Sequence, residues 1–231
     1  MINSKILKVT ELDDRQKQAM YGLYSQYYAG TSLELFLKDL DDKSHVLLLD
    51  EIRGFTTIKI FETFFEGQRV RVIFSGDTIV HHAHWGQHDL AQTWLKLAGQ
   101  IKQQQPDLPL YWLLIVKGQR TYRYLNVFSY TYYPCVGIET PSKVKKLMDQ
   151  LAVELFGTAY NADRGILSFK KSQGHLQETW ATVPAKDLRH PEVQFFLERN
   201  PGYAKGDELV CLCELNEANL KPLSRRFFID G

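Results

Sequence analysis

Polar residues with catalytic potential lie toward the end of an apolar segment at residues 69–82. Asp77 stands in the middle of this segment, where a carboxylate is costly to bury unless it is hydrogen-bonded or paired. It is a candidate base, or a group that orients a nearby histidine; a structural role in satisfying backbone amides is the alternative. The run Ser75–Gly76–Asp77 interrupts the strand alternation, which predicts a β-bulge that is either catalytic or an ordinary kink.

Four histidines, His81, His82, His84 and His88, follow within eleven residues of Asp77. Strand alternation predicts His82 and His84 on one face and His81 on the other. Imidazole titrates near neutral pH, so His82 or His81 is a candidate base or water relay; histidines satisfied at a strand end are the alternative. No Cys, Asp or Glu stands nearby at metal-ligand spacing, so we expect no metal.

The segment after these histidines predicts a helix that begins directly after a strand. Its apolar residues follow helical spacing over residues 89–105: Leu90, Trp94, Leu97 and Ile101. Such a helix directs its unpaired N–H groups and its positive dipole end into the adjoining crevice, where phosphate commonly binds. We therefore predict an anion-binding turn formed by His84, Trp85, Gly86, Gln87, His88, Asp89, Leu90 and Ala91.

A second polar group follows the apolar segment at residues 109–118. Gln119 and Arg120 begin a predicted short helix and could bind phosphate, or they could form a solvent-facing turn. Tyr122 and Tyr124 lie on the same helix. Tyrosines are equally common in cores, so packing is the alternative to a chemical role for either one.

The elements that position these residues follow a readable order: strand, two helices, three antiparallel strands, helix, strand, helix, strand. Short turns between the consecutive strands imply hairpins, and the helix between two apolar strands implies a parallel crossover. The predicted strands are at residues 6–9, 45–52, 54–65, 69–82, 109–118 and 130–135, and the predicted helices at 16–28, 32–40, 89–105 and 119–128.

Composition narrows the class of protein. The chain has 231 residues, 44% apolar and 24% charged, enough for an ordinary core, and its net charge of +1 gives no reason to expect nucleic acid as a partner. Cys135, Cys211 and Cys213 are too few for a disulfide framework and suggest core thiols. Residues 1–9 lack a signal-peptide core and no run is long enough for a transmembrane segment, so we expect a cytoplasmic protein.

The order of elements and the turn after the fourth strand resemble the GNAT fold (Gcn5-related N-acetyltransferases) over roughly residues 1–135. In that family the fourth strand ends in an Arg/Gln-x-x-Gly-x-Gly/Ala turn whose backbone amides hold the pyrophosphate of coenzyme A. The segment from Trp85 to Ala91 stands at this place. Only Gly86 and the terminal Ala91 correspond to residues of the pattern, and His88 and Asp89 depart from it. The resemblance implies a mixed α/β fold with a mostly antiparallel sheet, one parallel splayed pair and flanking helices.

The same resemblance implies an N-acyltransferase that moves an acyl group from a thioester to an amine. Acyl-CoA is the implied cosubstrate; an acyl-carrier protein (acyl-ACP), which would bring a single phosphate, is the alternative because Asp89 repels a pyrophosphate. The turn, Gln119 and Arg120 would bind the donor. Tyr124 would protonate the leaving thiolate, and His82, with or without Asp77, would deprotonate the amine.

Residues 136–231 exceed this fold and form a predicted α/β extension packed on a core at residues 1–135. Thr140 and Pro141 suit the start of a helix to about residue 156, in which Lys143, Lys145 and Lys146 form a solvated face. A strand at 166–169, a helix at 191–198 and a strand at 208–215 follow. The extension is a candidate wall for an acyl or acceptor pocket.

The general pattern of residues in three segments, without a defined catalytic motif, is more loosely similar to bacterial GNAT-like proteins. Some of these are maturases that attach fatty acyl chains to ribosomal peptides. The segments that carry this similarity are IFSGDT, LYWLLIVKGQRTYRYL and FLERNPGYAKGDELVCL. It implies a fatty acyl chain and an amine acceptor such as a Lys or ornithine side chain of a precursor peptide. The alternatives are a catalytically silent GNAT-fold binding module and another small-molecule enzyme; oligomeric state is left open.

Overall fold

The computed structural model describes residues 4–231, which form two compact units. The first unit consists of the chain up to Gln26, Ser32–Trp112 and Glu214–Gly231; the second consists of Tyr27–Thr31 and Leu113–Cys213. Strands β6 (Leu110–Val116) and β10 (Glu208–Glu214) contribute residues to both units. The units do not coincide with the predicted division at residue 135, and the description as a core with an extension stays a prediction.

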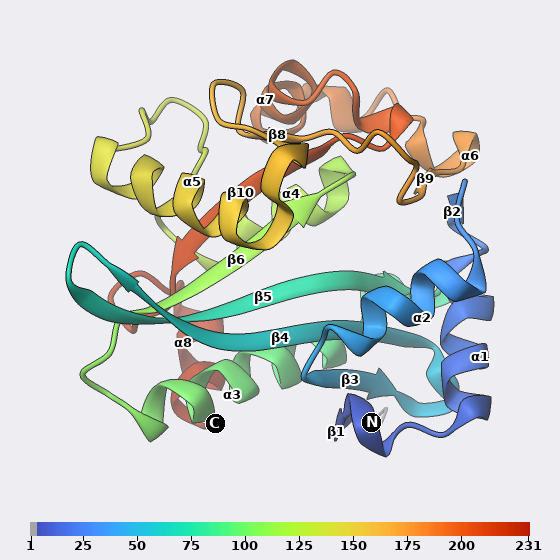
Figure 1. Cartoon of the computed structure of the whole chain (residues 1–231), viewed down its shortest axis with the longest axis horizontal. Helices are drawn as coiled ribbons and strands as arrows, with labels where there is room; N and C mark the ends of the chain where they lie inside the picture. Colours follow the sequence, from blue (N-terminus) through green and yellow to red (C-terminus); the bar gives the residue numbers. More distant parts are fainter. Residues whose placement is uncertain (1–3) are drawn as a thin grey trace. The chain divides into compact units, whose positions relative to one another are not determined.

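The first unit is built on consecutive antiparallel strands. In the order of hydrogen-bonded neighbours they are β1 (Ser4–Lys8), β3 (His45–Leu49), β4 (Gly54–Phe65) and β5 (Gln68–Val80), followed by the first residues of β6. The three pairs among β1, β3, β4 and β5 are antiparallel, as the short predicted turns required. The hairpin of β4 and β5 is the longest pairing (Figure 1).

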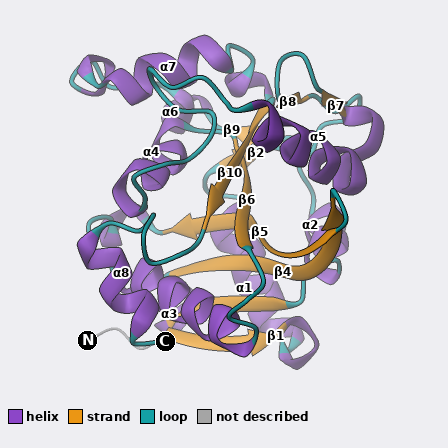
Figure 2. Ribbon diagram, turned by 90° about the vertical axis from the view of Figure 1, so that its left-hand side faces the viewer, coloured by secondary structure: helices purple, strands orange, loops and turns teal. Residues whose placement is uncertain are grey.

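Four α-helices among the described residues belong to the first unit. They are α1 (Asp14–Tyr24), α2 (Leu33–Asp41), α3 (Asp89–Gln104) and α8 (Pro222–Ile229). Asp13 caps α1 in a reciprocal arrangement with Gln16, and Ser32 caps α2. The predicted apolar stripe of α3 is buried, and α8 lies beside α3 (Figure 2). Short 3-10 turns cover Val9–Glu11, Asp50–Ile52 and His82–His84.

The second unit contains the remainder of β6 with β10, β8 (Ile166–Leu167) and β7 (Tyr160–Asn161), in that order. Its helices are α4 (Gln119–Phe128), α5 (Ser142–Phe156), α6 (Glu178–Ala181) and α7 (Pro191–Arg199). A separate short pair joins β2 (Tyr28–Ala29) to β9 (His175–Leu176). Further 3-10 turns cover Gly157–Ala159, Asp187–Arg189 and Tyr203–Lys205.

The fold class is the predicted one: mixed α/β, with an eight-stranded sheet that is mostly antiparallel and has one parallel pair. Cys211 and Cys213 are buried free thiols, as predicted, and burial raises the pKa of Cys211. Cys135 is also a free thiol but is only half-buried, so its prediction as a core thiol is wrong. None of the described helices is long and apolar enough to cross a membrane.

Several predicted boundaries are wrong for identifiable reasons. The first helix ends at Tyr24 rather than at Tyr28, because Tyr28 pairs with Leu176 in β2 and β9. Residues 130–135 form only isolated bridges, at Tyr133 and Cys135, instead of a strand. Thr140 does not cap α5, whose N-cap position is Pro141. Helix α8 was not predicted.

Candidate active site at the end of strand β5

Strand β5 contains a β-bulge at the predicted position. Ser75 pairs with Ile58 of β4, and Thr78 pairs with Thr56, so Gly76 and Asp77 together stand opposite the single residue Thr57. One extra residue in β5 interrupts the regular ladder, which frees backbone groups from their strand partners. The bulge therefore lies in the same strand that leads into the predicted anion-binding turn.

Glycine is required in the bulge. A Cβ at position 76 would lie 2.5 Å from Thr57 Oγ1 and 2.8 Å from Lys43 Cε. Lys43 has little room to move because its buried ammonium donates to the Asp39 carboxylate at 2.8 Å and to the Asp39 carbonyl at 3.0 Å. Any larger residue at position 76 would push against Thr57 and against the anchored Lys43.

The side chains around the bulge are polar, and most of them have hydrogen-bond partners. Ser75 is buried and its Oγ accepts from Trp112 Nε1 at 2.9 Å. Asp77 is half-buried. Thr57 Oγ1 is buried without a hydrogen-bond partner among residues 4–231. Thr57 and Lys43 are not among the residues predicted from the sequence. The available signals were two consecutive threonines, Thr56 and Thr57, within an apolar strand, and a lysine just before the preceding apolar strand.

The histidines are arranged differently from the prediction, because β5 ends at Val80 and strand alternation stops there. His81 accepts from the Ala83 amide at 3.3 Å, and its ring stacks on that of His82 with centroids 4.3 Å apart. Desolvation, followed by repulsion from His82 and His84, lowers the pKa of His81. His84 is half-buried, and its Nδ1 has no hydrogen-bond partner within the described chain.

No group of three or more His, Cys, Asp or Glu residues within residues 4–231 is arranged to hold a metal ion. The stacked histidines lie at the surface near Trp85, whose indole Nε1 donates to the Val80 carbonyl at 2.8 Å. This bond folds the turn back over the end of β5. His82 itself is exposed beside that turn.

The N-terminus of α3 has the features of an anion site. The N-cap residue His88 makes no side-chain cap, and the first helical bond runs from the Gln92 amide to the His88 carbonyl. The first-turn N–H groups of a helix have no partners within the helix itself. Gly86 has a φ of +92° and open space around its Cβ position, so the turn depends on glycine for its backbone rather than for a close contact.

The other predicted residues of this turn differ in what they offer. Trp85, Gln87 and His88 are exposed, whereas Leu90 places its side chain in the core, so only its backbone could contact a ligand. Asp89 and Ala91 are half-buried in the first turn of α3. The Asp89 carboxylate favours the positive end of the helix and opposes an added anion.

The first unit thus holds Asp77, His82 and the turn, whereas Gln119, Arg120 and Tyr124 belong to the second unit. Gln119 is buried, and its Oε1 has no partner among the described residues; Arg120 is half-buried. Tyr122 and Tyr124 differ sharply in environment. The structure thereby distinguishes two tyrosines that the sequence could not.

Tyr122 is completely buried, and its hydroxyl donates to the Pro134 carbonyl at 2.8 Å. Burial raises the pKa of Tyr122 far above its usual value. Tyr124 is 42% exposed on the outer side of α4, and partial desolvation raises the pKa of its hydroxyl. Tyr124 is therefore a surface residue of α4, while Tyr122 is a core residue.

Comparison with known proteins gives structural likenesses alone. No family model and no curated protein matches the chain. A probable N-acyltransferase from Enterococcus faecalis V583 is 16% identical with a TM-score of 0.40; the match covers 56% of this chain and 33% of that one. The chain therefore spans only a third of that protein's length.

Two Escherichia coli structures are also similar. ElaA is 19% identical with a TM-score of 0.36, covering 62% of this chain and 94% of its own. YhbS, a GNAT family N-acetyltransferase solved in complex with CoA, is 12% identical with a TM-score of 0.38, covering 55% and 69%. The solved structures that the chain is similar to thus include members of the GNAT family.

Proposed function

We propose that this protein is an N-acyltransferase that moves an acyl group from a thioester to an amine. Two neighbouring features carry the proposal. Strand β5 has a bulge at Gly76–Asp77, and the helix that follows it, α3, begins without a side-chain cap. A bulge offers a backbone N–H to a thioester carbonyl, and a helix N-terminus offers several to a phosphate. Acyl thioester donors carry both groups.

In this reaction the amine nitrogen attacks the thioester carbonyl carbon, the carbon–sulfur bond breaks, and the sulfur leaves as a thiolate. His82, with or without Asp77, is the proposed base that takes the amine proton. Tyr124 is the proposed acid that protonates the thiolate, a role consistent with its raised pKa and its exposure. The bulge amide would stabilise the oxyanion that forms during attack.

The donor is proposed to be an acyl-CoA or an acyl-ACP. Both present a phosphate attached to pantetheine, which the turn from His84 to Ala91 would hold, with Gln119 and Arg120 as further donor contacts. Asp89 opposes the two charges of a pyrophosphate more than a single phosphodiester. This charge favours the carrier protein as donor.

The proposed acyl chain is a fatty acyl, and the proposed acceptor is an amine on a peptide side chain, such as Lys or ornithine. Each methylene buried by the enzyme would contribute about 0.8 kcal/mol to selection by chain length. The aromatic run near α4 gives this substrate little support, because Tyr122, Phe128 and Tyr132 pack in the core of the second unit. The substrate proposal therefore depends on the looser sequence similarity. A cytoplasmic location also stays a prediction.

Binding of the donor tests the first half of the proposal. Acetyl-, decanoyl- and palmitoyl-CoA, and a decanoyl-ACP, would each be titrated into the protein by calorimetry and thermal shift. A ligand that binds the native state raises Tm by mass action. Gly86→Glu should abolish donor binding because it places a carboxylate in the turn. If the variant binds every donor like the wild type, the donor site lies elsewhere.

Gly67→Glu is the matched control. Gly67 also has a positive φ, +80°, and open space at its Cβ position, but it lies in the hairpin turn at the opposite end of β5. The two variants therefore carry the same added charge and similar backbone strain. Donor binding should survive in Gly67→Glu.

Transfer itself is tested with acetyl and decanoyl donors offered together to a peptide that contains lysine or ornithine, with products measured by mass spectrometry. Decanoyl transfer to the side-chain amine supports the full proposal. A preference for acetyl transfer to a small free amine would remove the fatty acyl and peptide proposals but keep N-acyl transfer. Donor binding with no transfer to any amine would favour the silent binding module.

A further inference from the structure

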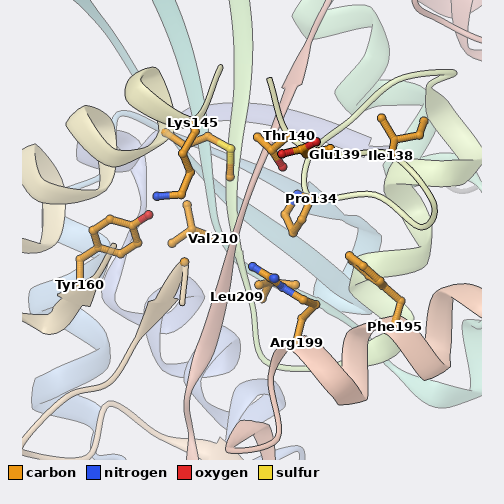
Figure 3. A pocket seen from close by; sticks show the side chains of 12 residues that line it. Pro134, Ile138, Glu139, Thr140, Lys145, Tyr160, Phe195, Arg199, Leu209 and Val210 are labelled. Atoms are coloured by element: carbon orange, nitrogen blue, oxygen red, sulfur yellow. The ribbon is translucent and has the colours of Figure 1, made fainter. Parts of the chain in front are cut away.

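A cavity of about 300 Å³ lies entirely within the second unit, between α5, α7 and β10. Its apolar surface comes from Met148, Phe195, Leu209 and Val210, together with Pro134. Its polar lining consists of Glu139, Thr140, Lys145, Tyr160 and Arg199 (Figure 3). Most of these residues lie in the segment at 136–231, and no site residue inferred from the sequence is among them.

Two of the polar groups, those of Lys145 and Tyr160, already use their hydrogen-bond donors within the protein. Lys145 Nζ donates to both oxygens of Asp149, at 2.5 and 2.7 Å, and to the Ala162 carbonyl at 2.7 Å, which uses all three of its N–H groups. Tyr160 donates to the same Asp149 carboxylate at 2.5 Å. Lys145, predicted on a solvated face, is thus a neutralised part of the cavity wall. Neither group is left for an anionic ligand.

Arg199 is different. Its only hydrogen bond runs from one terminal nitrogen to the Arg164 carbonyl at 3.3 Å, and no carboxylate within residues 4–231 pairs with it. Arg199 is exposed, and a guanidinium has five N–H donors, so most of these donors are free to bind water or a ligand. Figure 3 shows the guanidinium directed into the cavity beside Leu209.

Glu139 is the one acid that lines the cavity. It is exposed, and it does not pair with Arg199. Figure 3 places its carboxylate beside Thr140, on the side of the cavity away from Arg199. The Arg199 end therefore favours an anion, while the floor of Leu209 and Val210 favours an apolar body.

We infer that this cavity binds a small monocarboxylate with an apolar body, its carboxylate on Arg199 and its chain against Leu209, Val210 and Met148. Guanidinium and carboxylate match in a planar, charge-assisted pair. A cavity of ~150 Å³ is large enough to bind benzene, so a volume of about 300 Å³ has room for a larger ligand. A straight-chain acid with about ten non-hydrogen atoms, such as octanoate, has the required size and polarity. This ligand site goes beyond the proposed acyl transfer and does not depend on it.

The test is calorimetric titration of the full-length protein with three probes of equal chain length: octanoate, octanol and octylamine. Octanoate should bind at least about tenfold more tightly than octanol, the difference expected for one charge-assisted hydrogen bond. Octylamine should bind more weakly than either. Equal binding of octanoate and octanol, or a preference for octylamine, would overturn the inference.

Variants locate the site. Arg199→Gln should lose the tenfold advantage of octanoate and leave octanol binding unchanged. Glu139→Gln is the matched control, since it removes the opposite charge from the same cavity and should bind octanoate as tightly as the wild type or a few-fold more tightly. Thr140→Trp should weaken octanoate and octanol alike by filling space. Undiminished octanoate binding in folded Arg199→Gln or in folded Thr140→Trp would contradict the assignment, and Arg199→Lys tests the charge if the glutamine variant does not fold.

Discussion

Gly99 in α3 lies directly against the carbonyl of Phe228 in α8: a Cβ at position 99 would be 1.8 Å from the Phe228 oxygen. The two residues are 129 positions apart in the sequence. Gly99 is buried, Phe228 is buried, and Gln103 Nε2 donates to the Ile229 carbonyl at 3.3 Å in the same contact. The end of the chain is therefore closely packed on α3, the helix that presents the candidate anion site.

Gly99→Ala should destabilise the protein, because the added methyl group must displace backbone rather than a flexible side chain. Overpacking of this kind costs about 1–3 kcal/mol, and each kcal/mol lowers Tm by about 2–4 °C in a chain of this size. Thermal unfolding by circular dichroism measures the shift. An unchanged Tm would mean that α8 does not pack closely on α3.

Gly22→Ala is the control for this substitution. Gly22 lies in α1 with no atom within 4 Å of its Cβ position. Alanine has the higher helix propensity, so the control should gain up to about 1 kcal/mol. Gly→Ala is thus expected to lower the free energy of unfolding at position 99 and to raise it at position 22.

Tyr124→Phe should reduce acyl transfer by about 10²–10⁴-fold while donor binding and Tm stay near wild type, because it removes the proposed general acid from an exposed position. Tyr122→Phe should lower stability and leave acyl transfer unchanged. It removes the buried hydrogen bond to Pro134, which costs about 1 kcal/mol of stability, and it should leave the rate of transfer intact. Single-turnover rates and urea unfolding separate the two effects; a rate for Tyr124→Phe within a few-fold of wild type would refute its role.

His82→Ala should also lower the rate of transfer by about 10²–10⁴-fold without loss of donor binding, since its loss removes the proposed base. His190→Ala is the matched control, because His190 is an exposed histidine at the start of α7. Asp77→Asn distinguishes the alternatives for the bulge. A folded, donor-binding Asp77→Asn protein with little activity, next to an active His82→Ala protein, would make Asp77 the principal base.

Stability should decline at alkaline pH because three tyrosines of the second unit are fully or partly buried. Burial raises the pKa values of Tyr122, Tyr132 and Tyr160 above the ordinary value near 10. The unfolded chain then loses these protons before the folded chain does, so the stability that these tyrosines contribute is full below about pH 10 and is lost as pH rises further, by up to about 1.4 kcal/mol per pH unit for each tyrosine.

Urea unfolding at pH 8, 10 and 11 measures this slope. Tyr122→Phe removes one of these titrating tyrosines, so its stability should fall less steeply than that of the wild type above pH 10. Parallel slopes for the two proteins would show that Tyr122 does not contribute.

Much of the first unit could be predicted because its signals are local. The spacing of Leu90, Trp94, Leu97 and Ile101 depends only on the helical repeat, and the bulge at Ser75–Gly76–Asp77 follows from a break in the two-residue alternation of a strand. The histidines show the limit of such reasoning. Strand alternation predicts the faces of His81, His82 and His84, but the backbone leaves the sheet after Val80 and His81 instead caps a 3-10 turn.

The sequence by itself determined which segments form helices and strands around β5, the bulge within that strand, and the glycine that the following turn requires. Only the tertiary structure decided which of Tyr122 and Tyr124 is buried, where Arg199 lies, and how closely Phe228 approaches Gly99. Backbone periodicity is set by neighbouring residues, whereas burial and unpaired charge depend on segments that are distant in the chain.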